Sequence, residues 1–105
     1  MWNPPAKERL EKIPRLYETE DIPIKDTLVY LHFHIFSSHW FITEYNGCDL
    51  FFGYAILNGD TINSEWGYVC FNDLKAISVQ DVEITCEPET SWRIRPVSEV
   101  TEIQL

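Results

Sequence analysis

The sequence predicts an α+β fold with one antiparallel sheet of four to six strands, an N-terminal helix and a short C-terminal helical segment. Two observations lead to this prediction. Strand-length runs of β-branched and aromatic residues recur between residues 28 and 95, and short turn sequences separate them. Helical patterns occur mainly near the two ends of the chain. Strands joined by hairpins form antiparallel sheets, and we expect the helical segments to cover one side of this one.

Chain length and composition set the scale of the fold. The chain has 105 residues, 45% of them hydrophobic, which is enough to fill one core, so we expect a single domain over residues 1–105. Four Trp, five Tyr and six Phe are many for this size. We therefore expect some aromatic rings to lie on the surface.

The N-terminal helix is predicted over residues 6–13. Asn3 is a suitable N-cap, and prolines are favoured at the first helical positions. Leu10 and Ile13 give the helix one apolar edge, and Pro14 ends it. A charged connector follows up to residue 26.

The first two predicted strands are residues 28–36 and 39–45, joined by a loop at residues 37–38. This loop places Phe36 opposite His39. Because side chains alternate along a strand, one face of the pair is apolar and is the predicted core face: Leu31, Phe33, Ile35, Trp40 and Ile42. The other face carries Tyr30, His32, His34, Phe36, His39, Phe41 and Thr43.

Asn46-Gly47 is the strongest turn signal in the chain and leads into a third strand over residues 49–57. The loop has two or three residues, and the two alternatives place opposite faces of the third strand on the core. A loop over residues 58–64 separates it from a fourth strand over residues 65–71.

The last third of the chain predicts shorter elements. Residues 74–76 form one helical turn, and residues 79–86 form a fifth strand. Residues 92–95 are a candidate edge strand, and residues 98–102 are the predicted C-terminal helical turn.

The net charge of −9 argues against direct binding of nucleic acid, which requires clustered Lys and Arg. Residues 26–92 contain ten carboxylates and one cation, Lys75. This acidic segment either keeps the protein in solution or meets a basic partner.

No apolar run is long enough to span a membrane, and the N-terminus lacks the pattern of a signal peptide, so we expect a cytoplasmic protein. The spacing of Cys48, Cys70 and Cys86 matches neither a redox pair nor a zinc ribbon, so we expect three reduced and mostly buried thiols.

Three histidines are the strongest candidate for chemistry. His32, His34 and His39 point to the same side of the first hairpin, and three imidazoles can hold zinc. However, the sequence places no carboxylate or cysteine beside them as a supporting group. We therefore predict ordinary surface or half-buried histidines, with no metal and no cofactor.

Other motifs are weaker. Residues 60–65 resemble a calcium loop but lack its ligand spacing and central glycine. No serine or cysteine lies in a nucleophile motif, and no glycine-rich phosphate loop is present. The sequence thus predicts no catalytic residue.

Residues 13–20 (IPRLYETE), residues 49–60 (DLFFGYAILNGD) and residues 65–68 (EWGY) resemble the family catalogued as domain of unknown function 2958. The resemblance extends from Trp2 to about Pro96. It implies a bacterial accessory protein encoded on plasmids, phages and integrative elements, and it implies no activity or functional residue.

Three hypotheses follow. The first is a non-catalytic module that binds another protein, such as a basic or DNA-binding one, through an acidic and aromatic surface. The second is a DNA mimic that inhibits a DNA-binding enzyme, and the third is a small metal-dependent hydrolase. We favour the first, with contact residues on or near turns: Tyr17, Glu18, Glu20, Asp49, Asp60, Glu65 and Trp66.

Overall fold

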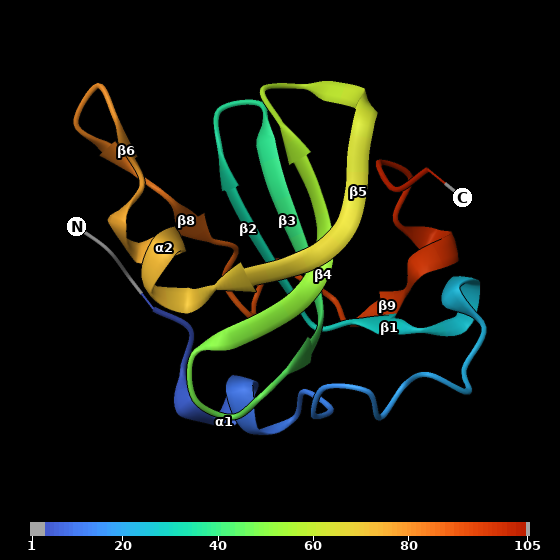
Figure 1. Ribbon diagram of the computed structural model, residues 1–105. Coiled ribbons are helices and arrows are strands. Elements are labelled where there is room, and N and C mark those ends of the chain that lie inside the picture. Colours follow the sequence, from blue (N-terminus) through green and yellow to red (C-terminus); the bar gives the residue numbers. More distant parts are fainter. Residues whose placement is uncertain (1–3, 105) are drawn as a thin grey trace.

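A computed structural model describes residues 4–104 and confirms the α+β class (Figure 1). Its centre is a five-stranded antiparallel sheet with the strand order β5-β4-β3-β2-β8. The sheet strands are β2 (Leu31–Ile35), β3 (Ser38–Tyr45), β4 (Leu50–Leu57), β5 (Asp60–Cys70) and β8 (Thr85–Cys86).

The remaining elements are short. They are α1 (Lys7–Glu11), η1 (Ile24–Asp26), β1 (Leu28–Val29), α2 (Phe71–Ala76), β6 (Ser78–Val79), β7 (Val82–Glu83), β9 (Arg95–Pro96) and η2 (Val97–Glu99). β1 pairs with β9, and β6 pairs with β7. The N-cap of α1 is Ala6, which makes no side-chain cap, and the predicted cap Asn3 lies outside the described residues.

The first hairpin has its loop one residue earlier than predicted. Ile35 pairs with Ser38, so the loop is Phe36-Ser37 and not Ser37-Ser38. Ser38 is buried, and its hydroxyl accepts the N–H of Asn58 at 2.9 Å, which keeps it in the strand. The pairing shifts by two residues, so each side chain keeps its predicted face.

The sheet buries apolar side chains on both faces, and the expectation of one covered side was wrong. The first core contains all five predicted core residues of the hairpin. The second core, on the opposite face, consists of Val29, Phe41, Tyr54, Ile56, Trp92, Val97, Val100 and Ile103. Four of these come from the C-terminal segment, whose apolar residues are too widely spaced to predict how it packs.

The connection between β3 and β4 has four residues, 46–49, rather than two or three. Asn46 Oδ1 accepts the N–H groups of Cys48, Asp49 and Leu50 at 2.8–3.0 Å, and Gly47 takes a positive φ of 87°. An irregularity in the pairing at Thr43, between Ile42 and Glu44, shifts the register.

Three other predicted strands differ from the observed ones. β5 begins at Asp60, which pairs with Leu57 of β4, and Asn63 N–H donates to Asp60 Oδ1 at 3.1 Å within the predicted loop. The predicted fifth strand is divided into β6, β7 and β8: a tight turn at Gln80 and Asp81, which take positive φ angles, separates β6 from β7, and Ile84 separates β7 from β8. The edge strand predicted over residues 92–95 is shorter and lies at β9.

Candidate functional site

A groove of about 370 Å³ lies between the connector after α1 and the sheet strands β4 and β5. We call it the aromatic groove and define it by Tyr17, Ile22, Ile24, Phe52, Trp66 and Tyr68. Trp66 and Tyr68 share one face of β5 because side chains alternate along a strand. The Phe52 ring lies 6.0 Å from that of Trp66 and 5.2 Å from that of Tyr68, between centroids.

Glu44 holds the connector over the groove. The residue is 5% exposed, and its carboxylate accepts the N–H of Tyr17 at 3.0 Å, the N–H of Thr19 at 3.1 Å and the Thr19 hydroxyl. A buried carboxylate is tolerated when hydrogen bonds replace its water. The residues involved are 25 and 27 positions apart, so no sequence signal indicated this role for Glu44.

The rim of the groove exposes large apolar side chains. Tyr17 is 61% exposed, Ile24 55% and Tyr68 52%. Tyr68 Oη donates a hydrogen bond to Tyr17 Oη at 3.2 Å, and this bond raises the pKa of Tyr68. Tyr17 has a positive φ of 72°, a conformation that is uncommon for a bulky residue and that Glu44 stabilises.

The seven predicted contact residues do not form one surface. Tyr17, Glu20 and Trp66 line the groove, and Glu18 lies beside it, where it accepts the N–H of Arg15 at 2.6 Å. Asp60 and Glu65 line a separate hollow. Asp49 lies in the β3–β4 turn and accepts a hydrogen bond from Asn46 at 2.9 Å.

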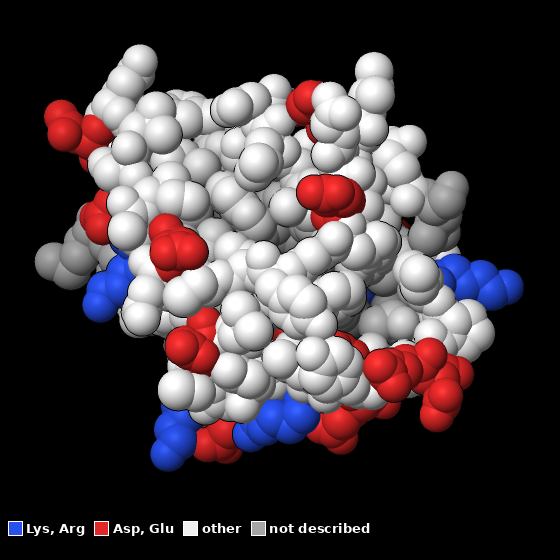
Figure 2. Space-filling view, viewed as in Figure 1, with Lys and Arg blue, Asp and Glu red and all other residues white. Residues whose placement is uncertain are grey.

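Sequence reasoning missed the other members of the groove. Phe52 and Tyr68 lie in predicted strands, and their exposure depends on a register that was left open. Ile22 and Ile24 lie in the connector, where alternation around Pro23 was a weak signal. The space-filling view in Figure 2 shows that the face over β4 and β5 is mostly uncharged and that most carboxylates lie around it.

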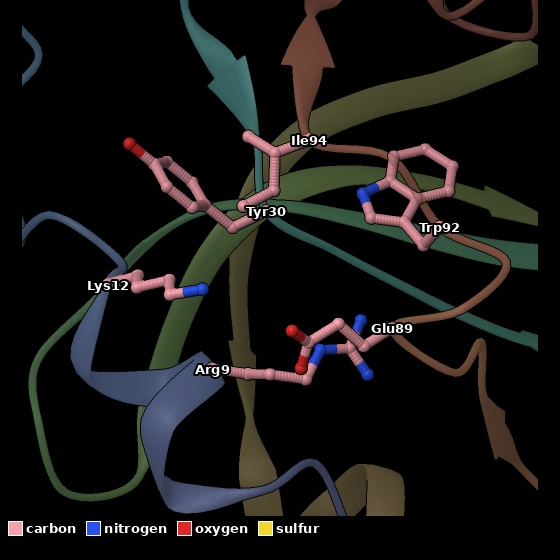
Figure 3. A pocket seen from close by; sticks show the side chains of 6 residues that line it. All are labelled: Arg9, Lys12, Tyr30, Glu89, Trp92 and Ile94. Carbon is pink, nitrogen blue, oxygen red and sulfur yellow. The ribbon is translucent and has the colours of Figure 1, made fainter.

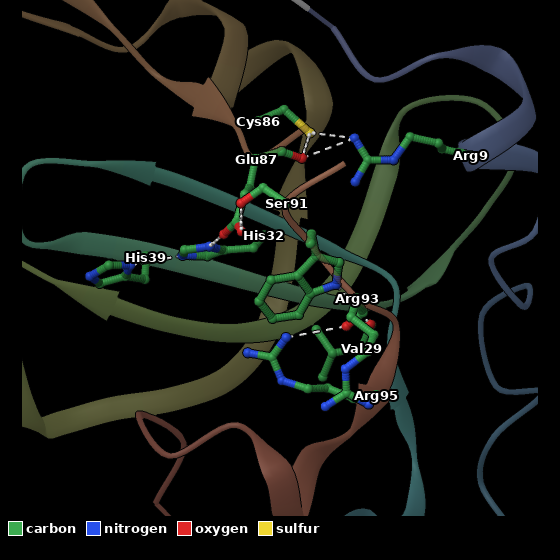
Figure 4. Close-up of polar contacts among 10 residues, drawn as sticks. Arg9, Val29, His32, His39, Cys86, Glu87, Ser91, Arg93 and Arg95 are labelled. Atoms are coloured by element: carbon green, nitrogen blue, oxygen red, sulfur yellow. Dashed lines mark hydrogen bonds and ion pairs between the residues drawn. The ribbon is translucent and has the colours of Figure 1, made fainter. Parts of the chain in front are cut away.

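A second polar cluster lies on the second-core face of the sheet, where a chain of hydrogen bonds joins Ser91, Glu87, His32 and His39 (Figure 4). Ser91 Oγ donates to Glu87 Oε2 at 2.6 Å. His32 Nδ1 lies 2.7 Å from Glu87 Oε1, and His32 Nε2 lies 2.8 Å from His39 Nδ1. With both imidazoles neutral and Glu87 ionised, His32 donates to Glu87 and accepts from His39.

Burial lowers the pKa of His32, and desolvation likewise lowers that of His39. Partial burial would raise the pKa of Glu87, but hydrogen bonds from Ser91 and His32 hold it below its usual value. The Ser91 hydroxyl bonds the carboxylate and not an imidazole, so this geometry differs from an activated serine nucleophile. Glu87 lies 55 residues from His32, and no sequence signal connected them.

Metal ligation requires several free donor atoms that converge. Among residues 4–104, no group of three or more His, Cys, Asp or Glu side chains is arranged to hold a metal ion.

All three cysteines are free thiols. Cys86 is buried and Cys70 is half-buried, as expected. Cys48 is exposed, so the expectation of a buried thiol was wrong for this residue.

A smaller pocket of about 160 Å³ lies between α1 and the C-terminal segment (Figure 3). Arg9 and Lys12 line it together with Glu89 and Trp92. Arg9 Nη1 already donates to the carbonyl of Glu87 at 3.0 Å, and Arg95 stacks 4.0 Å from the Trp92 ring centroid. The aromatic groove has more than twice this volume and more exposed apolar surface, so it is the better candidate site.

No helix within residues 4–104 has the length and apolarity to cross a membrane. No protein-family model, curated protein or solved structure matches this chain.

Proposed function

We propose that this protein is a small acidic accessory protein of bacterial mobile genetic elements and acts in the cytoplasm as a non-catalytic protein-binding module. Its resemblance to domain of unknown function 2958 supports the biological context. The observation that supports binding is the aromatic groove, which exposes Tyr17, Tyr68 and Ile24 beside a half-buried Trp66. Contiguous apolar surface of this kind on a small protein marks an interaction site.

The groove has the composition of an interface centre. Tyr and Trp supply large contact areas with few rotatable bonds and are enriched among residues that dominate binding energy. The Glu44 hydrogen bonds fix the connector before a partner arrives, which reduces the entropy lost on binding.

Charge favours a basic partner. Glu18, Glu20 and Asp21 lie on the connector next to the groove, and the whole chain carries −9. Carboxylates around an apolar centre accelerate association with a basic partner more than they tighten the final complex. Most carboxylates lie around this mostly uncharged face and few lie on it, which supports protein binding over imitation of a DNA backbone (Figure 2).

A matched pair of variants tests this proposal. Ile24→Ser changes the groove, and Val82→Ser changes the remote β6–β7 hairpin at a residue of similar exposure, 44% against 55%. Tagged wild type and both variants are used to capture partners from the bacterium that carries the gene, at low and high salt. We expect Ile24→Ser, but not Val82→Ser, to lose a salt-sensitive partner.

The control is thermal unfolding, which must show that both variants remain folded. Equal capture by wild type and Ile24→Ser, or loss with both variants alike, would rule out the groove as the binding surface.

A further inference from the structure

β5 forms an open edge of the central sheet. It pairs with β4 on one side, and no strand among residues 4–104 pairs with its other side. Figure 1 shows β5 running across the front of the molecule. An unpaired edge presents backbone N–H and C=O groups that another strand can bond.

The register shows which groups these are. Phe71 N–H donates to Asp49 O at 2.7 Å, and pairing continues in step through Gly67 with Gly53. In an antiparallel ladder, hydrogen-bonded and non-hydrogen-bonded pairs alternate. Gly67 and Val69 therefore bond β4, whereas the N–H and C=O groups of Trp66 and Tyr68 point outward.

A hollow flanks this edge on each face of the sheet. Trp66 and Tyr68 face the aromatic groove on one side. On the other side, a hollow of about 220 Å³ lies over Gly53 and Gly67, with Trp40 and Ile42 among its lining residues. A strand added to β5 would direct alternate side chains to these two faces.

Gly67 leaves room for a side chain from outside. A Cβ at Gly67 would meet no atom within 4 Å, so crowding inside the protein does not require glycine there. A large apolar side chain on a neighbouring strand, opposite Gly67, would cover the bare backbone and fill the hollow, as aromatic residues do beside glycines in other sheets.

We propose that the partner binds as an extended segment that adds a sixth strand to the outer edge of β5. This inference rests on the proposed function and specifies the partner's form. The residue opposite Gly67 is large and apolar, and its neighbours enter the aromatic groove. Basic residues flank them and face the carboxylates of the connector and Glu65. Mutual repulsion between chains of −9 disfavours a second copy as the occupant.

A peptide selection tests this mode of binding. Randomised peptides of about nine residues are selected against the full chain, and a selected peptide is resynthesised with N-methyl groups on either set of alternate residues. Binding of each form is measured to wild type, Gly67→Val, and the Ile24→Ser and Val82→Ser pair.

We expect selected peptides to alternate large apolar residues and to contain Lys or Arg. One N-methylated form should bind about tenfold or more weakly, because its hydrogen bonds to Trp66 and Tyr68 are lost, and the other should bind normally. Gly67→Val should weaken binding similarly by filling the hollow, with an unfolding midpoint equal to or above that of wild type.

Two results would overturn strand addition while keeping the proposed function: a peptide that depends on Ile24 but binds equally in both N-methylated forms, or one that is insensitive to Gly67→Val. Dimerisation of the free chain in sedimentation that Gly67→Val abolishes would show that a second copy occupies the edge and would also overturn it. Selection of no peptide that depends on Ile24 would contradict both proposals.

Discussion

The two edges of the central sheet are built in opposite ways. At one edge, β8 has only two residues, Cys86 is buried, and Arg9 reaches over from α1 to bond the Glu87 carbonyl. At the other edge, β5 has eleven residues and no covering strand among residues 4–104.

Proteins usually protect long edge strands with lysine, proline or a covering element. β5 contains no lysine and no proline, and Asp60 and Glu65 are its only charged residues. We expect the closed edge to contribute to stability, whereas the open edge is where we propose that the partner binds. Substitutions at the two edges should therefore affect different measurements.

The largest difference is expected between Phe33→Ala and Tyr68→Ala. Phe33 is fully buried in β2 and pairs with Cys86, so removing its ring should cost about 3–5 kcal/mol in the free energy of unfolding. Tyr68 is 52% exposed on β5, and its removal should cost about 1 kcal/mol or less. Urea unfolding measures both, and equal losses would contradict the division of roles.

A paired set of glycines gives the next largest effect. Gly53 and Gly67 are opposite each other, but a Cβ at Gly53 would lie 2.1 Å from the Phe41 carbonyl oxygen. Gly53→Ala should therefore destabilise the protein by about 1–3 kcal/mol. Gly67→Ala should be neutral or stabilise by about 0.5–1 kcal/mol, because alanine has less chain entropy to lose. A loss of stability in Gly67→Ala would show that its side of the sheet is not open.

The smallest expected effect is a pH dependence at the histidine network. Burial holds the folded pKa of His32 below its ordinary 6.5, so the unfolded chain binds more protons. The contribution of neutral His32 to the free energy of unfolding is therefore fully present above about pH 6.5 and should be lost as the pH drops towards 5. Glu87, whose pKa is held below 4.5, adds a second loss at still lower pH.

The matched variant for this effect is His32→Phe, which keeps a ring stacked on Phe41 at 4.6 Å between centroids. Its free energy of unfolding should fall less between pH 7 and pH 5 than that of wild type, with His39 contributing the remainder. Partner binding should be unaffected, since the network lies away from the groove. Greater stability at pH 5 than at pH 7 in the wild type would refute the assignment.

Local patterns were enough to predict the strands and the core face of the first hairpin. Period-two alternation keeps Leu31, Phe33 and Ile35 on one side even when the loop moves by one residue, because the pairing shifts by two. The same local information could not predict how the C-terminal segment covers the second face.

Contacts between distant residues account for what was missed. Glu44 reaches the connector at Tyr17 and Thr19, and Glu87 reaches His32, and each pairing depends on the finished fold. The irregularity at Thr43 and the ordered start of β5 likewise depend on cross-strand partners. Of the seven predicted contact residues, Tyr17, Glu20 and Trp66 lie in the groove because the connector folds onto β5, which no pattern in the sequence indicated.

Amide hydrogen exchange along β5 tests the open edge most directly. In the free protein, we predict fast exchange at Trp66 and Tyr68, whose N–H groups point outward, and slow exchange at Gly67 and Val69, which bond β4. Addition of a bound peptide or partner should protect Trp66 and Tyr68 and leave Gly67 and Val69 unchanged. Equal protection of all four amides in the free protein, or no new protection at Trp66 and Tyr68 in the complex, would contradict this account.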